Sequence, residues 1–312
     1  IYFLSRPRRF GKSLLISTLE NYFLGRRELF RGLAIESLEK EWAEYPVFHI
    51  DFNAINFSKP HVLDEVLEET VSAWERKFPP EDRYTATGKR FTEVLRQAHR
   101  QTGRRCVVLI DEYDKPLLDV LDTDYKINIG GSERLLEDWN REVLKGFYSV
   151  FKAADSDLQF VLLTGVTKFS QVSVFSGFNQ PQDISMDSRY DALCGITQQE
   201  LEQYFPEPIG TMAAFYGESP EEMLSRLKRQ YDGYHFSEGM LDVYNPFSLL
   251  NAFAKQTIRD YWFASGTPTY LIRLLAHTDE NLDELTGRYY SPEEFVDYKA
   301  DVEKPLPMIY QS

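Results

Sequence analysis

The chain has 312 residues, of which 43% are hydrophobic, and it carries a net charge of −14. This length suits one large domain or two modest ones, and the acidic balance excludes a protein that binds nucleic acid over its whole surface, since such a surface is basic. There is also no secretory signal and no apolar run of about 18 or more residues that would cross a membrane.

Apolar runs alternate with helical patterns in the first half of the chain. The run at 105–110 is apolar throughout, as strands covered on both faces are. Alternation of strands with helices predicts an α/β fold with a mostly parallel, helix-covered sheet. The expected strands are 1–4, 46–52, 105–110 and 158–163, and the expected helices are 13–24, 60–78, 86–102 and 132–154. In the first helix the residues expected to share the buried face are Leu14, Leu15, Leu19, Tyr22 and Phe23.

The pattern changes after about residue 195, so we place a domain boundary near 190–197, between a core of residues 1–195 and a second segment of residues 196–312. An aromatic, turn-rich stretch at 231–239 predicts a small hairpin, and a packed hairpin is favoured over a binding surface. The expected helices are 197–205, 208–216, 219–230, 246–257 and 267–276. The chain opens at Ile1 and stops within an apolar run at 309–312, so we expect both ends to be cuts through a longer protein.

A phosphate-binding pattern lies between the first strand and the first helix. The pattern is Gly-x-x-x-x-Gly-Lys-Ser/Thr, and Arg6 replaces its first glycine. Backbone N–H groups at a helix start bind anions; Gly11 allows close approach, Lys12 reaches the β- and γ-phosphates, and Ser13 binds Mg²⁺. The alternative is an ordinary strand-to-helix turn with a solvated basic face. The predicted nucleotide-binding residues are Pro7, Arg8, Arg9, Phe10, Gly11, Lys12, Ser13 and Leu14.

The arginines of this loop have two interpretations. Arg6, Arg8 and Arg9 either contact the γ-phosphate or an acidic partner, or belong to a solvated loop with ordinary ion pairs.

Two adjacent carboxylates follow the strand at 105–110. Asp111 and Glu112 lie where ligands of open α/β sheets bind, at the carboxyl end of a central strand. We expect Asp111 to hold Mg²⁺ and Glu112 to polarise the attacking water, which favours hydrolysis over transfer to a small molecule. The alternative is a strand that ends in a solvated acidic turn at 111–114.

A third set of polar residues follows the strand at 158–163. Thr164 and Thr167 are candidates to sense the γ-phosphate and position water, and Lys168 is a candidate to neutralise charge in the transition state. For Thr164, a structural role at the strand end is equally open. The five histidines have no metal-ligand spacing, and the two cysteines lie too far apart in the sequence to suggest a disulfide framework, so we expect a reducing cytoplasm.

These motifs resemble a predicted AAA-ATPase-like family that is abundant in gut Bacteroidetes and some Firmicutes. The resemblance rests on residues 2–13, 110–114, 163–170, 231–234 and 244–248. It implies a P-loop NTPase of the additional-strand class, related to archaeal ATPases and signalling NTPases, with the Thr164 strand between the Lys12 and Asp111 strands. It also implies that residues 196–312 form a helical, winged-helix-like segment, and that full-length members often continue into a restriction-endonuclease-like nuclease domain.

Two functions remain open on the sequence alone. The favoured one is slow, Mg²⁺-dependent ATP binding and hydrolysis that acts as a switch or drive for an effector, either a protein partner or an attached nuclease-like domain. The alternative is a nucleotide-binding scaffold that does not hydrolyse, and a phosphotransferase is a distant third. Intact Asp111 and Glu112 favour hydrolysis.

Overall fold

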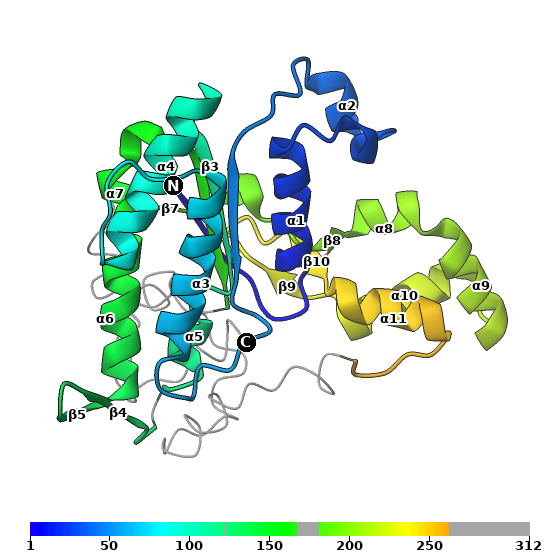
Figure 1. Ribbon diagram of the computed structural model, residues 1–312. Helices are drawn as coiled ribbons and strands as arrows, with labels where there is room; N and C mark the ends of the chain where they lie inside the picture. Colours follow the sequence, from blue (N-terminus) through cyan, green and yellow to red (C-terminus); the bar gives the residue numbers. More distant parts are fainter. Residues whose placement is uncertain (122, 167–180, 262–312) are drawn as a thin grey trace.

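The computed structural model describes residues 1–121, 123–166 and 181–261 (Figure 1). Its centre is a five-stranded sheet in the order β2-β3-β6-β1-β7, in which every neighbouring pair is parallel. The predicted parallel sheet is confirmed, and β6 lies between β1 and β3 as the family resemblance implied. The strands are β1 (Tyr2–Ser5), β2 (Val47–Asp51), β3 (Cys106–Asp111), β6 (Leu158–Gly165) and β7 (Gln182–Asp183).

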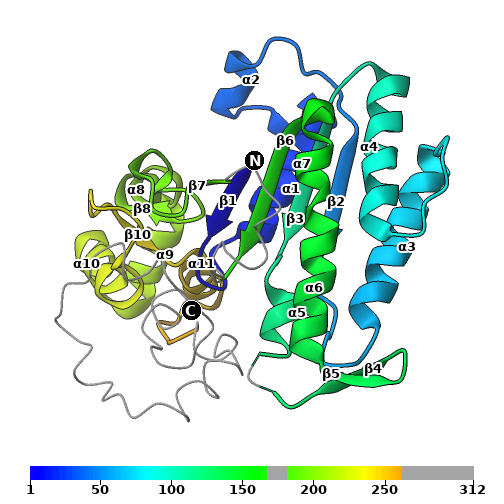
Figure 2. The same ribbon diagram turned by 90° about the vertical axis from the view of Figure 1, so that its left-hand side faces the viewer.

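Helices cover both faces of this sheet (Figures 1 and 2). Successive side chains of β3 point to opposite faces, so Val108 and Ile110 join one hydrophobic cluster and Val107 and Leu109 join another. None of the helices in the described ranges has both the length and the apolar composition needed to cross a membrane. One face carries α3 (Val62–Lys77), α4 (Thr87–Thr102), α6 (Leu136–Tyr148) and α7 (Val150–Ala153), and the other carries α1 (Lys12–Phe23).

Shorter elements join these parts. The connection from α1 to β2 contains η1 (Arg27–Phe30) and α2 (Ala34–Leu38). Directly after β3 comes α5 (Lys115–Leu118), and two single-turn helices, η2 (Asp155–Asp157) and η4 (Ser188–Tyr190), precede β6 and the second segment.

The predicted helix at 132–154 begins too early. Residues 132–135 instead form β5 (Ser132–Leu135), which pairs antiparallel with β4 (Lys126–Ile129). The turn between these strands is Gly130-Gly131, with φ of 58° and 89°, which is the backbone that two-residue hairpins require. This turn fixes the hairpin, so the helix can start only at Leu136.

The predicted buried face of α1 is wrong at its first residue. Leu14 is 72% exposed, whereas Ile16 is fully buried against Val107 and Leu109 of the sheet. Residues two positions apart on a helix point to different sides, so Ile16 and Leu14 cannot both face the sheet. Leu14 therefore faces away from the core at the start of the helix.

Residues 196–261, here called the C-terminal module, have their own hydrophobic cluster. A small antiparallel sheet has the order β8-β10-β9, so the predicted hairpin is present as β9 and β10. Capping boxes at Thr197 and Ser219 explain where two helices start. The elements are β8 (Ile196–Thr197), α8 (Gln198–Tyr204), α9 (Pro206–Tyr216), α10 (Pro220–Tyr231), β9 (Tyr234–His235), β10 (Asp242–Tyr244) and α11 (Pro246–Lys255). The helix expected at 267–276 lies outside the described residues.

Candidate functional site

The loop between β1 and α1 forms an open set of backbone donors. Within the described part of the chain, the amides of residues 11–14 donate no hydrogen bond, whereas Arg8 and Arg9 lie in a tight turn; the first helical bond runs from the Leu15 amide to the Gly11 carbonyl, at 3.0 Å. Gly11 has φ of 84°, a left-handed conformation that glycine adopts without strain. A Cβ at this position would meet no atom within 4 Å, so glycine is favoured here by its backbone conformation and not by lack of space. Unpaired amides at the positive end of a helix dipole bind anions.

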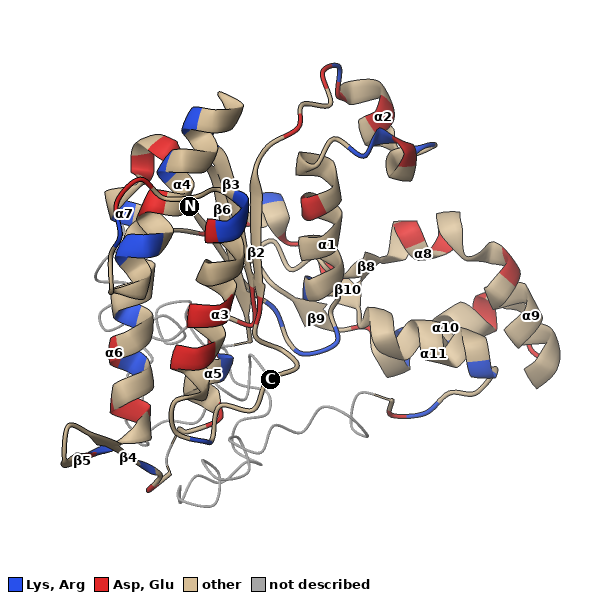
Figure 3. Ribbon diagram, in the orientation of Figure 1, with Lys and Arg blue, Asp and Glu red and all other residues tan. Residues whose placement is uncertain are grey.

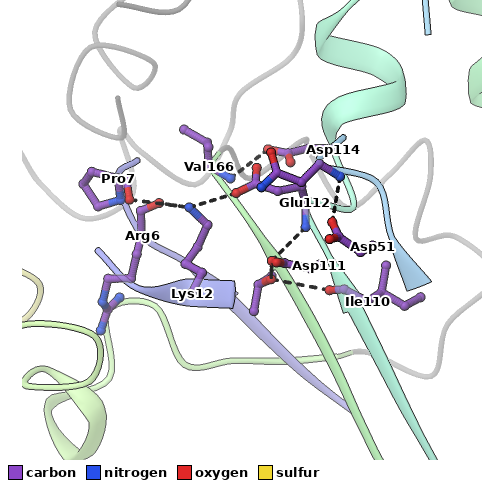
Figure 4. Close-up of polar contacts among 11 residues, drawn as sticks. Arg6, Pro7, Lys12, Asp51, Ile110, Asp111, Glu112, Asp114 and Val166 are labelled. Atoms are coloured by element: carbon purple, nitrogen blue, oxygen red, sulfur yellow. Dashed lines mark hydrogen bonds and ion pairs between the residues drawn. The ribbon is translucent and has the colours of Figure 1, made fainter. Parts of the chain in front are cut away.

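Lys12 lies between this loop and β3 (Figure 4). Its side chain is only 4% exposed, and its ammonium donates to the carbonyl of Arg6 at 3.1 Å and to that of Pro7 at 3.5 Å. The same ammonium is 3.2 Å from Oε1 of Glu112. A buried cation is costly unless a carboxylate compensates it, so Glu112 is the counter-charge of Lys12 in this state.

Thr164 fixes the carboxylate of Asp111. The Thr164 hydroxyl donates to Oδ1 of Asp111 at 2.6 Å, and the Glu112 amide donates to the same oxygen at 3.1 Å. Both Thr164 and Asp111 are buried. All hydrogen bonds to Asp111 within the described ranges go to Oδ1, which leaves Oδ2 as an acceptor. This hydrogen bond gives Thr164 a structural role at the end of β6, and its role at the γ-phosphate stays a prediction.

Glu112 leaves the strand in a strained conformation. Its φ is 53°, in the left-handed region that non-glycine residues rarely adopt. Such conformations cost on the order of 1 kcal/mol or more and persist where the surroundings hold them. The Lys12 ion pair and a bond from the Lys115 amide to the Glu112 carbonyl, at 3.0 Å, hold this one. The strain turns the carboxylate out of line with β3 and towards the loop.

Asp114 is a site residue that the sequence did not single out. It is fully buried, and its Oδ2 accepts a hydrogen bond from the Val166 amide at 2.9 Å (Figure 4). A Cβ at Gly165 would lie only 2.6–2.8 Å from atoms of Tyr113 and Asp114, so only glycine fits there. The solvated acidic turn considered for 111–114 is therefore wrong, because Asp111 and Asp114 are both buried. In the sequence, the glycine at position 165, directly after Thr164, is the feature that could have indicated this close packing.

Arg6 is buried and packs against the C-terminal module. Its side chain is 1% exposed, and its guanidinium lies 4.1 Å from the ring centroid of Phe236. Arg6 is therefore not part of a solvated loop. The guanidinium instead donates to the carbonyls of Ser5, Ser185, Tyr190 and Leu193, at 2.7–3.0 Å.

The C-terminal module packs against the loop between β1 and α1 through aromatic contacts. Phe10, only 1% exposed, has its ring centroid 4.8 Å from that of Tyr234 and 5.5 Å from that of Phe236. Arg9 lies over the ring of Phe247, at 4.8 Å. The Arg-rich loop is visible in blue beside the module in Figure 3. The predicted hairpin is thus packed, and the loop between β1 and α1 packs against it.

A cavity of about 890 Å³ opens at this loop and lies within the range of ligand pockets, roughly 300–1,000 Å³. Its lining includes Arg8 and Arg9 with Gly11, Lys12, Ser13, Leu14 and Glu112. Of the remaining predicted residues, Pro7 is buried and Phe10 faces the hairpin, while Thr167 and Lys168 lie outside the described residues.

Two side-chain oxygens at this site suit a magnesium ion as ligands. Ser13 lines the cavity, and its hydroxyl makes no hydrogen bond within the described ranges. Asp111 is buried and does not itself line the cavity, but it offers Oδ2. The described residues hold no group of three or more His, Cys, Asp or Glu side chains able to bind a metal. Mg²⁺ bound together with phosphates needs only one or two protein oxygens, because water fills the other positions.

The two cysteines should resist alkylation at about pH 8. Burial raises the pKa of Cys194 to about 11 and that of Cys106 to about 12. Because only the thiolate reacts, a rise of two units lowers the reactive fraction roughly 100-fold. Mass spectrometry after iodoacetamide treatment checks this. Cys194 packs with Phe10 and Phe236, so its rapid labelling while Cys106 stays unmodified would show that the contact between loop and hairpin opens.

Comparison with known proteins identifies the family of this chain. Residues 1–175, more than half of the chain, match the model of a family described as "Predicted AAA-ATPase". The chain is also 41% identical over 275 residues to an "Uncharacterized protein in vnfD 5'region" of Azotobacter chroococcum mcd 1. That match covers 88% of the chain and 49% of the relative, so the chain spans about half the length of this curated relative. The chain belongs to the predicted AAA-ATPase family.

Proposed function

We propose that this chain binds Mg-ATP in the cavity at Lys12 and hydrolyses it slowly, as a switch or drive for an effector. The observation that carries this proposal is the run of amides from residue 11 to residue 14, which have no acceptor within the described residues. The family assignment supports nucleotide binding or hydrolysis. Phosphate oxygens are the acceptors that such a loop accommodates best.

Phosphate binding would change the partner of Lys12. In the structure the ammonium is paired with Glu112, at 3.2 Å. The β- and γ-phosphates compete for this ammonium, and its transfer to them frees the Glu112 carboxylate. Glu112 can then accept a proton from the attacking water. The ion pair therefore keeps the base occupied until a nucleotide arrives.

The remaining groups support this step. Ser13 and Asp111 would hold Mg²⁺, which neutralises charge on the phosphates when it is bound. Thr164 keeps Asp111 in place through the hydrogen bond of 2.6 Å, and Asp114 ties the same turn to the end of β6. Lys168, outside the described residues, is proposed to stabilise charge in the transition state.

Phosphate release separates the candidate functions. Purified protein incubated with ATP and Mg²⁺ should release inorganic phosphate, and the release should stop when the metal is chelated. Tight binding without any release would favour the scaffold. Loss of ATP with phosphate appearing on a second molecule would favour a phosphotransferase. Absence of both binding and release would refute the proposal.

The switch part of the proposal rests on the contact between loop and hairpin. Phe10 and Arg6 are both packed against Phe236, so a change in the loop is transmitted to the C-terminal module. We propose residues 196–312 as a second, winged-helix-like domain whose effector is a protein partner or a nuclease-like domain in the whole protein. The acidic chain favours a protein partner, and we propose a cytoplasmic location.

Hydrogen exchange tests this coupling. A non-hydrolysable ATP analogue should slow exchange at residues 8–14 and also at 234–244, because Phe10 connects the two. The Lys12→Ala variant, which should not bind the analogue, is the control. Protection confined to 5–20 and 105–115, with 196–261 unchanged, would mean that the module is a passive attachment.

A further inference from the structure

Three exposed or half-buried apolar side chains line the cavity next to the loop. Leu14 of α1 is 72% exposed, Leu250 of α11 is 47% exposed, and Phe247 of α11 is half-buried. Single exposed apolar residues are ordinary, but these three share one cavity with the amides of the loop. Phe247 and Leu250 are not part of the module's buried cluster, so packing does not account for them.

The orientation of a nucleotide in the cavity follows from Glu112. Hydrolysis requires the γ-phosphate to lie near this carboxylate, at the end of β3, so the rest of the nucleotide must extend away from β3. Figures 1 and 2 show α11 on the β1 side of the sheet and α5 on the β3 side. On the β3 side most of the lining is polar or charged, with Asn53, Asn56, Ser58, Lys115 and Asp119 beside Leu118 and Tyr125, whereas at α11 the lining is Pro246, Phe247 and Leu250.

We propose that Leu14, Phe247 and Leu250 form the subsite for the nucleobase, so that α1 and the C-terminal module together hold the base. This inference rests on the proposed function. The base offers two apolar faces, which suit the Phe247 ring and the two leucines, and the Arg9 guanidinium, 4.8 Å from the Phe247 centroid, adds a planar cation. These three apolar side chains carry no hydrogen-bonding groups, so the subsite selects for ring area and favours purines over pyrimidines.

Calorimetric titration with two ligands tests the subsite. Tripolyphosphate has the phosphates of ATP without the base, so it reports on the loop alone. Phe247→Ala should weaken Mg-ATP binding roughly 10-fold, the scale of a lost base-aromatic stack, and leave tripolyphosphate binding unchanged. Leu250→Asn should weaken ATP binding by a smaller factor and should likewise leave the affinity for tripolyphosphate unchanged. Phe215→Ala, at a 63% exposed position on α9, is the matched control and should change neither.

The outcomes separate this inference from the proposed function. If the wild type binds neither ligand, the nucleotide site itself is wrong. If the wild type binds both, but Phe247→Ala and Leu250→Asn bind ATP as the wild type does, only the base subsite is wrong. An equal loss for both ligands in Phe247→Ala would mean that the ring acts through Arg9 on the loop, which would also overturn the subsite. Thermal unfolding of each variant verifies that it is folded.

Discussion

Replacing Glu112 with glutamine is expected to lower ATP turnover roughly 100-fold or more, while the protein still binds Mg-ATP. The amide keeps the shape of the carboxylate but cannot accept the proton of the attacking water. It also removes the negative partner of Lys12, which lies 3.2 Å away in the structure. The phosphates then no longer compete with a carboxylate for the ammonium, so the affinity for Mg-ATP should be equal to or higher than that of the wild type.

Phosphate release and fluorescent-nucleotide titration on the same preparation measure both effects. Glu133→Gln, at a carboxylate that is 64% exposed on β5, is the control and should keep wild-type turnover. Unchanged turnover in Glu112→Gln would assign the base to another residue. A large loss of affinity would mean that the ion pair with Lys12 builds the loop instead of restraining the base.

Replacing Lys12 with alanine is expected to reduce the affinity for Mg-ATP roughly 100-fold, the scale of a lost hydrogen bond between charged groups in a buried site. Its side chain is 4% exposed and its ammonium donates to two carbonyls of the loop where we propose that the phosphates bind. Alanine removes this charge and leaves Glu112 without its counter-ion. Negative charge then faces the phosphates, which adds to the loss.

The same titration checks this second variant. Lys126→Ala, which removes an exposed lysine from β4, is the matched control for the loss of one positive charge. Lys12→Arg keeps the charge with a different shape and should recover part of the affinity. Wild-type affinity in Lys12→Ala would show that the nucleotide, if it binds, lies elsewhere.

The sheet was predictable because its strands have local signatures. The run at 105–110 is apolar throughout, and β3 is buried on both faces. The β4–β5 hairpin was missed because the helical pattern after Leu136 was extended backwards through Ser132. The Gly130-Gly131 pair was the local signal for it.

The candidate phosphate-binding loop is recognisable in the sequence as a motif, but the contacts that support it in the fold are not. Gly11, Lys12 and Ser13 are recognised by the short, fixed spacing of the pattern, and Asp111 is recognised because it directly follows an apolar strand. Arg6 and Phe10, in contrast, contact residues that lie almost the whole described chain away, such as Phe236. No local pattern encodes a contact across that separation. The aromatic stretch at 231–239 indicated a packed hairpin, but it did not indicate what the hairpin packs against.

The most direct test of ATP hydrolysis at this site is the reaction in water enriched in heavy oxygen. If Glu112 activates water at the γ-phosphate, the phosphate released from Mg-ATP should carry oxygen from the solvent, and Lys12→Ala and Glu112→Gln should release almost none. Mass spectrometry of the phosphate measures this. Hydrolysis at this site would be contradicted if the wild-type protein bound Mg-ATP but released no labelled phosphate. It would also be contradicted if both variants released labelled phosphate as the wild type does.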